Sequence, residues 1–167
     1  MRLSKSPKNV AFCGITTAFA IVLGYIEHMI PLPVGIYGLK LGLANLAILS
    51  LLYITDAKKA LTVQLIRIIL CAILFGNAFS VIYSLCGGIF SFIIMVLLKN
   101  RSKFSPVGVS ICAAIAHNIA QFTVAVIIVD QIRIALYLPV LIIFGAISGL
   151  IIGTCSLPVI HQFSKNK

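Results

Sequence analysis

An all-helical integral membrane protein is the fold class that this sequence predicts, and three observations support it. Of the 167 residues, 61% are hydrophobic and only 10% are charged, and the mean hydropathy is +1.18. A soluble domain typically carries about 25% charged residues, so this chain cannot cover a globule with a wetted surface. Long apolar runs approach the roughly 20 residues that a membrane-spanning helix needs. Finally, basic residues gather in short clusters between these runs, as in multispanning membrane proteins.

The net charge of +10 does not indicate a polyanionic partner, because its carriers flank apolar runs instead of forming one basic surface. The composition therefore excludes a soluble enzyme, a disordered tail and a nucleic-acid-binding domain. A signal peptide is also excluded for the first run, since it is longer than a signal-peptide core and equally apolar runs follow it. We expect one domain over residues 1–167.

Six membrane spans are predicted in order along the chain. They lie near 9–30, 41–55, 60–76, 79–98, 107–129 and 135–158. Each break between spans has the chemistry of a turn or of a wetted loop. The breaks are the Pro- and Gly-rich stretch 31–38, the polar stretch 55–59, the pair 76–77, the basic stretch 99–106 and the charged stretch 130–133. The second and third spans are short, so we expect them to lie against neighbouring helices.

The thirteen Lys and Arg residues predict the orientation. With six spans, ten of them fall on one side: Arg2, Lys5, Lys8, Lys58, Lys59, Lys99, Arg101, Lys103, Lys165 and Lys167. Lys40 and Arg133 fall on the other side, and Arg67 lies within the third span. An excess of basic residues in short loops marks the cytoplasmic side. Both termini are therefore expected in the cytoplasm.

Polar residues inside the apolar runs are the strongest functional signal, because such groups usually face a bundle interior or a cavity. Arg67 lies eight residues after Lys59, about 12 Å along a helix, near mid-membrane. Gln64 is its neighbour on the same helix, and the fifth span places His117 and Gln121 one turn apart on one face. Apart from Gln64, the polar groups fall at mid-depth or in the outer half. The predicted ligand-binding residues are Lys40, Asn45, Arg67, Asn77, Tyr83, His117, Asn118 and Gln121.

The cationic groups in this set favour an anionic or carbonyl-rich ligand arriving from outside. Apolar walls are expected from Phe75, Phe79, Tyr83 and Phe122. Structural alternatives stay open: residues 117–121 as interhelical hydrogen-bond contacts, Arg67 as a charge paired with Glu27 or a carbonyl, and Glu27 and Lys40 as interfacial groups.

The segment 31–40 is too apolar for a wetted connector and too rich in Pro and Gly for a helix. We interpret it as a lid over the outer site, since non-helical backbone at membrane depth needs protein or a cavity to receive it. The alternative is a loop in the headgroup layer, anchored by Tyr37.

Small residues at four-residue spacing predict two close-packing helix faces. Gly145, Gly149 and Gly153 in the last span are expected to pack within the bundle. The first span carries Ala11, Gly14 and Ala18 on one face, and this face is the candidate for docking a partner.

Several signatures are missing from the sequence. The five cysteines have no paired spacing, so we interpret them as small buried hydrophobic residues without disulfides or metal. No phosphate-binding G-x-x-x-x-G-K-[ST] motif occurs. The three acidic residues, Glu27, Asp56 and Asp130, form no Asp-rich cluster. We therefore expect no catalytic residue, no metal site, no intrinsic cofactor and no enzyme activity.

Several stretches together resemble the bacterial membrane family of Gx transporters, also labelled heptaprenyl diphosphate synthase component I. These are 40–45 (KLGLAN), 75–77 (FGN), 84–88 (SLCGG) with Ser91, and 108–110 leading to 116–118 with Gln121. The resemblance covers roughly residues 8–158. That family is similar to the substrate-binding S components of energy-coupling factor vitamin transporters, which are six-helix proteins. They have an outward pocket, a closing loop after the first helix and a small-residue face for a coupling subunit.

What the resemblance implies is a gating loop at 31–40 and a docking face at Gly14 and Ala18, where S components typically show Ala-x-x-x-Ala. Asn45, Asn77, His117, Asn118 and Gln121 would contribute to the pocket or its support. The partners would be a transmembrane coupling subunit and two ATPases that hydrolyse ATP. The location would be the bacterial cytoplasmic (inner) membrane.

The leading hypothesis is therefore a substrate-binding subunit of an energy-coupled importer, capturing a vitamin-, flavin- or prenyl/quinone-like molecule from the extracellular side. The alternative is an accessory membrane subunit for prenyl diphosphate or quinone metabolism, or for flavin-linked extracellular electron transfer. A self-powered carrier is the third hypothesis, and it lacks a polar path to the cytoplasmic side.

Overall fold

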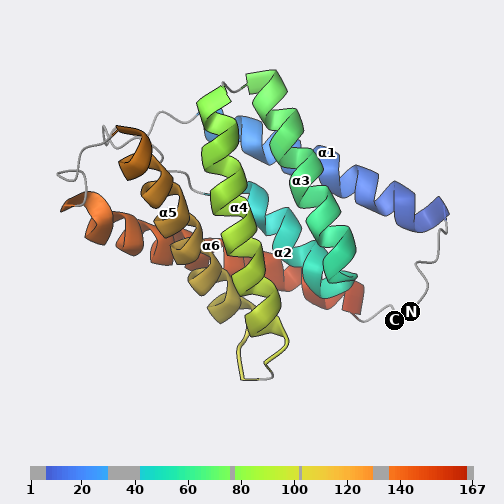
Figure 1. Ribbon diagram of the computed structural model, residues 1–167. Coiled ribbons are helices and arrows are strands. Elements are labelled where there is room, and N and C mark those ends of the chain that lie inside the picture. Colours follow the sequence, from blue (N-terminus) through green and yellow to red (C-terminus); the bar gives the residue numbers. More distant parts are fainter. Residues whose placement is uncertain (1–6, 30–41, 76–77, 102, 130–135, 165–167) are drawn as a thin grey trace.

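The computed structural model describes residues 7–29, 42–75, 78–101, 103–129 and 136–164. In chain order, its helices are α1 (Pro7–Met29), α2 (Ala44–Ile54), α3 (Ala57–Phe75), α4 (Ala78–Lys99), α5 (Pro106–Val129) and α6 (Leu138–Ser164) (Figure 1). Within these ranges there is no β-strand. The predicted all-helical class is confirmed.

Four helices are long and apolar enough to cross a membrane: Asn9–Met29, Val81–Lys99, Pro106–Ile128 and Leu138–Phe163. The eleven residues of α2 extend only about 16 Å, well short of the roughly 30 Å of a bilayer core. The nineteen residues of α3 have the length but carry Lys58, Lys59 and Arg67. The chain is therefore a membrane-embedded helical protein, whereas six crossings and their orientation stay predictions.

Three helix ends differ from the predicted span limits, which themselves stay predictions. The second begins at Ala44 instead of 41, because Gly42 adopts a left-handed φ of 71° and its carbonyl accepts from the Asn45 amide at 2.8 Å. The third begins at Ala57 instead of 60, directly after the polar break. The last continues through Pro158 to Ser164, since a membrane helix tolerates a proline when surrounding groups satisfy the freed carbonyl.

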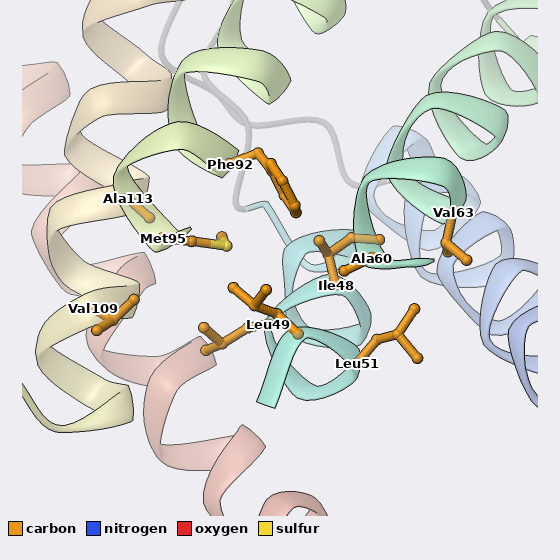
Figure 2. Close-up of a cluster of buried hydrophobic side chains, with 10 residues drawn as sticks. Ile48, Leu49, Leu51, Ala60, Val63, Phe92, Met95, Val109 and Ala113 are labelled. Carbon is orange, nitrogen blue, oxygen red and sulfur yellow. The ribbon is translucent and has the colours of Figure 1, made fainter. Parts of the chain in front are cut away.

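The short helix α2 forms the centre of the bundle. It contacts α1, α3 and α6, and its residues from Ala44 to Leu52 are buried except Leu46. In Figure 2, Ile48, Leu49 and Leu51 of α2 lie among side chains from α3, α4 and α5, including Phe92, Met95 and Val109. Although α2 cannot reach across a bilayer, its side chains form the apolar core.

The polarity of the molecule is that of a membrane protein. Its buried side chains include many polar ones: Asn45, Ser50, Gln64, Ser91, Ser110, His117, Asn118, Gln121, Ser148 and Ser156. Its outer surface carries large apolar ones, such as Ile15 on α1, Ile73 on α3 and Ile127 on α5, each at least 70% exposed. A lipid environment accepts such a surface, and polar groups then find partners inside the bundle.

The C-terminal ends of α2 and α4 meet at one end of the bundle. Lys99 Nζ donates to the Leu52 carbonyl at 2.5 Å and lies 5.3 Å from the centre of the Tyr53 ring. A cation at a helix C-terminus satisfies end carbonyls and favours the helix dipole. Lys99 therefore serves as the cap of α2 in addition to any role in orientation.

Candidate functional site

The candidate site is centred on two adjacent glycines in the middle of α4. A Cβ atom at Gly87 would lie 2.6 Å from Gln121 Cγ and 3.0 Å from His117 Nε2, both on α5. These distances are below ordinary contact, so the absence of a side chain lets α5 bring both polar residues against the α4 backbone. The prediction that His117 and Gln121 share one face is confirmed.

The second glycine receives polar groups from α3. A Cβ atom at Gly88 would lie 2.8 Å from Gln64 Nε2 and 2.7 Å from Ile68 Cδ1. Gln64 Oε1 in turn accepts a hydrogen bond from Arg67 Nη2 at 3.1 Å.

We call this set the glycine-pair cluster: Gln64, Arg67, Gly87, Gly88, Ser91, His117 and Gln121. Several of its buried polar atoms have no hydrogen-bond partner within the described part of the chain: both amide atoms of Gln121, Arg67 Nε and Ser91 Oγ. Gln121 is 2% exposed and Ser91 is 0% exposed. Buried polar groups are almost always hydrogen-bonded, so such a concentration calls for an explanation. These donors and acceptors are suited to hold a polar ligand group by hydrogen bonds.

Asn118 belongs to a different contact. Its Nδ2 donates to the Leu141 carbonyl of α6 at 2.9 Å and lies 2.9 Å from the position of a Cβ atom at Gly145. Its amide therefore joins α5 to α6, while its neighbour His117 faces α4. This is the interhelical hydrogen bond that the sequence left open as an alternative.

The remaining predicted ligand-binding residues are dispersed. Asn45 is buried at the start of α2, and a Cβ atom at Gly42 would lie 3.3 Å from its Nδ2 and 3.6 Å from Ile152 Cδ1 of α6. Tyr83 is half-buried on α4, one turn before Gly87. Lys40 and Asn77 lie outside the described residues, as does the predicted lid at 31–40.

The aromatic residues expected to line the site are also not shown to gather in one place. The Phe75 ring centre lies 4.8 Å from that of Tyr25 and 6.4 Å from that of His28, so Phe75 packs between α3 and α1. Phe122 is buried on α5, and the side chain of Phe79 is outside the described set.

Glu27 connects α1 to α2. Its Oε1 accepts from the Gly42 amide at 2.6 Å, next to the left-handed turn that precedes α2. This contact holds the end of α1 against the turn that precedes α2.

Sequence reasoning missed the two glycines and Ser91 as site residues. A usable signal existed, because Ser84, Gly87, Gly88 and Ser91 recur at three- and four-residue spacing and so share one helix face. A polar and small face inside an apolar span indicates a surface where other polar side chains approach.

The small-residue faces on α6 and α1 have different surroundings. Cβ atoms at Gly149 and Gly153 would lie 2.6 Å and 2.8 Å from the Cα atoms of Ile111 and Val107 on α5, which confirms packing within the bundle. On α1, Ala11, Gly14 and Ala18 are exposed, and within the described ranges no other helix has an atom within 4 Å of the position of a Cβ at Gly14.

The cysteine prediction needs correction. All five are free, but Cys155 is exposed and the other four are half-buried, since an apolar thiol is tolerated on a lipid-facing surface. Within the described ranges, no three His, Cys, Asp or Glu residues gather as a metal site would require.

A family model described as heptaprenyl diphosphate synthase component I matches residues 16–158. The chain therefore belongs to this family, as the sequence motifs predicted. No curated protein and no solved structure matches the chain.

Proposed function

We propose that this member of the heptaprenyl diphosphate synthase component I family is the substrate-binding membrane subunit of an energy-coupled importer. It would capture a small vitamin-, flavin- or prenyl/quinone-like molecule from the extracellular side. The observation that carries the proposal is Gln121, whose amide is 2% exposed and has no partner at either polar atom within the described residues. A ligand group that pairs with this amide would remove the cost of burying it.

The proposed membrane arrangement has six spans with both termini in the cytoplasm of a bacterium. The ten-to-two distribution of basic residues supports this orientation. In it, the glycine-pair cluster lies near the middle of α3, α4 and α5, where polar groups are most costly and most often functional. Arg67 and His117 supply positive charge or hydrogen-bond donors for an anionic or carbonyl-rich ligand.

The energy for import would come from partner subunits, since the chain has no phosphate-binding loop of its own. We propose a transmembrane coupling subunit and two ATPases as partners. The exposed face of α1 formed by Ala11, Gly14 and Ala18 would dock the coupling subunit, because small residues let a second helix backbone approach closely. No catalytic step is assigned to this chain.

Native mass spectrometry of the protein extracted gently from its own membrane tests the proposal. Coupling and ATPase subunits, and a retained small molecule, are the expected results. Gln121→Leu and Arg67→Gln should each lower ligand retention at least tenfold. Ser148→Ala is the matched control, because Ser148 is buried and, among the described residues, bonds the Gly145 carbonyl of its own helix. Equal ligand retention in Gln121→Leu, Arg67→Gln and the control would refute the site.

A second candidate function is favoured by the family description, which names a component of a prenyl diphosphate synthase. In that role the chain would be a non-catalytic membrane subunit assisting prenyl or quinone chemistry, or flavin-linked electron transfer. The same extraction distinguishes the two functions, since a co-purifying prenyl synthase or flavoprotein without ATPases would favour the accessory role.

A further inference from the structure

The basic residues at one end of the bundle come together from two separate loops. Lys99 at the end of α4 bonds the Leu52 carbonyl near the end of α2, and α3 begins only a few residues later, at Ala57. This contact therefore places the start of α3 and the segment after α4 at the same end. Figure 1 shows α3 and α4 as neighbours, and the two helices are in contact.

The basic side chains at this end differ in whether they form an ion pair or a hydrogen bond. Lys59 forms a 3.3 Å ion pair with Asp56, and Lys99 is held by α2. Lys58, Arg101 and Lys103 are exposed, and their side chains make no ion pair in the part of the chain that the structure describes. We call these three residues the basic corner.

Each side of the basic corner continues into an exposed apolar stripe. On α3, residues at helical spacing from Lys58 include Ile66, Ile69 and Ile73, which are 43%, 50% and 73% exposed. On α4, Leu97, Ile93 and Phe90 precede Arg101 and are 56%, 47% and 58% exposed. A positive end joined to an apolar stripe is complementary to an amphiphile with an anionic head and acyl chains.

We propose that the basic corner binds an anionic phospholipid, with its phosphate at Lys58, Arg101 and Lys103 and its acyl chains along the stripes of α3 and α4. The dimensions agree. Lys58 to Ile73 extends about 22 Å along α3, and Phe90 to Lys99 extends about 14 Å along α4, so both stripes fit within a hydrocarbon core about 30 Å thick. This inference is independent of the proposed import function.

The test measures lipid retention by the purified full chain in detergent, using native mass spectrometry with phosphatidylglycerol and phosphatidylcholine of identical acyl chains. Phosphatidylglycerol should be retained at least tenfold better. Neutralising Lys58, Arg101 or Lys103 to Gln should each lower its affinity about fivefold, as expected for one basic group at an anionic lipid surface. Arg101→Lys should keep most of the binding, and free glycerol 3-phosphate should not compete because it lacks the chains.

The single variant Lys165→Gln is the charge-matched control, since it also removes one positive charge but outside the basic corner. An equal loss of phosphatidylglycerol in this control would overturn the proposal and indicate a response to net charge alone. Equal retention of phosphatidylcholine would overturn it as well. Thermal unfolding of each variant in detergent separates a lipid effect from misfolding, because all three side chains are exposed and their loss should leave the midpoint unchanged.

Discussion

α6 and α1 carry the same kind of small-residue pattern, but among the residues that the structure describes only the α6 face packs closely against another helix. Gly149 of α6 approaches the backbone of α5 so closely that a Cβ atom would lie 2.6 Å from Ile111 Cα. Gly14 of α1 faces no atom of another helix within 4 Å in the described part of the chain. Small residues at four-residue spacing therefore indicate that a helix can be approached closely, but they do not indicate by which helix.

The largest effect is expected from Gly149→Leu. Its side chain would meet backbone atoms, which cannot rotate away as a side chain can, so α5 and α6 must separate. We expect a loss of about 3 kcal/mol in unfolding free energy, at the upper end of overpacking costs. Unfolding by SDS titration in mixed micelles measures it, and a wild-type midpoint would show that α6 does not depend on this contact.

Gly87→Ala should have a smaller effect on stability and a larger one on binding. The new methyl group would displace Gln121 and His117, which are 2.6 Å and 3.0 Å from it, at about 1 to 2 kcal/mol. Ligand retention should fall with it. Gly108→Ala is the matched control, because its nearest neighbour, Ser105 Oγ, lies at an ordinary 3.6 Å. Equal behaviour of these two variants would remove Gly87 from the site.

Gly88→Ala tests the contribution of α3 to ligand retention, as Gly87→Ala tests that of α5. It would displace Gln64 and Ile68 on α3 while leaving the α5 side chains in place. A ligand held mainly by Gln121 should survive Gly88→Ala better than Gly87→Ala, and binding assays of the two purified variants compare them directly.

Asn118→Ala should cost only about 0.6 kcal/mol, the average of an interhelical hydrogen bond in a membrane. It removes the 2.9 Å bond to the Leu141 carbonyl but leaves the glycine contacts of α6. SDS titration should show a small shift with unchanged ligand retention. A loss of ligand at constant stability would instead place Asn118 in the site.

Gly14→Leu is expected to leave the unfolding midpoint unchanged, since no described residue of another helix lies within 4 Å of a Cβ atom at this position. Under the proposed function it should nevertheless abolish co-purification of the coupling subunit, because a large side chain prevents close approach of a partner helix. Retained co-purification would move the docking face elsewhere on the molecule.

The sequence predicted much of the fold because bilayer insertion imposes long apolar helices that end at charged or Pro- and Gly-rich breaks. It predicted that α2 would be short and lie against neighbouring helices, but it did not predict the left-handed turn at Gly42 that precedes the helix. For the site, it found Arg67, His117 and Gln121 by their unusual polarity. It grouped Asn118 with these residues because Asn118 is next to His117 in the sequence. On a helix, however, adjacent side chains point about 100° apart.

Gly87 and Gly88 were not predicted as site residues for a related reason. The role of a glycine inside an apolar span is ambiguous from the sequence alone. It can give flexibility at a lipid-facing position, allow a close contact between two helices, or leave room for polar side chains. Only the arrangement of α3 and α5 on either side of Gly87 and Gly88 distinguishes these roles. The spacing of these glycines indicates a small helix face, but which side chains pack against that face is known only from the positions of α3 and α5.

The capping of α2 by Lys99 has a consequence for biogenesis. An eleven-residue helix is too short to cross the bilayer by itself, and the Leu52 carbonyl near its end is bonded by Lys99 at the end of α4. The N-terminal half of the chain can therefore reach its final arrangement only after α4 has left the ribosome and entered the membrane. We expect chains that stop before Lys99 to be recognised as incomplete and degraded by membrane proteases.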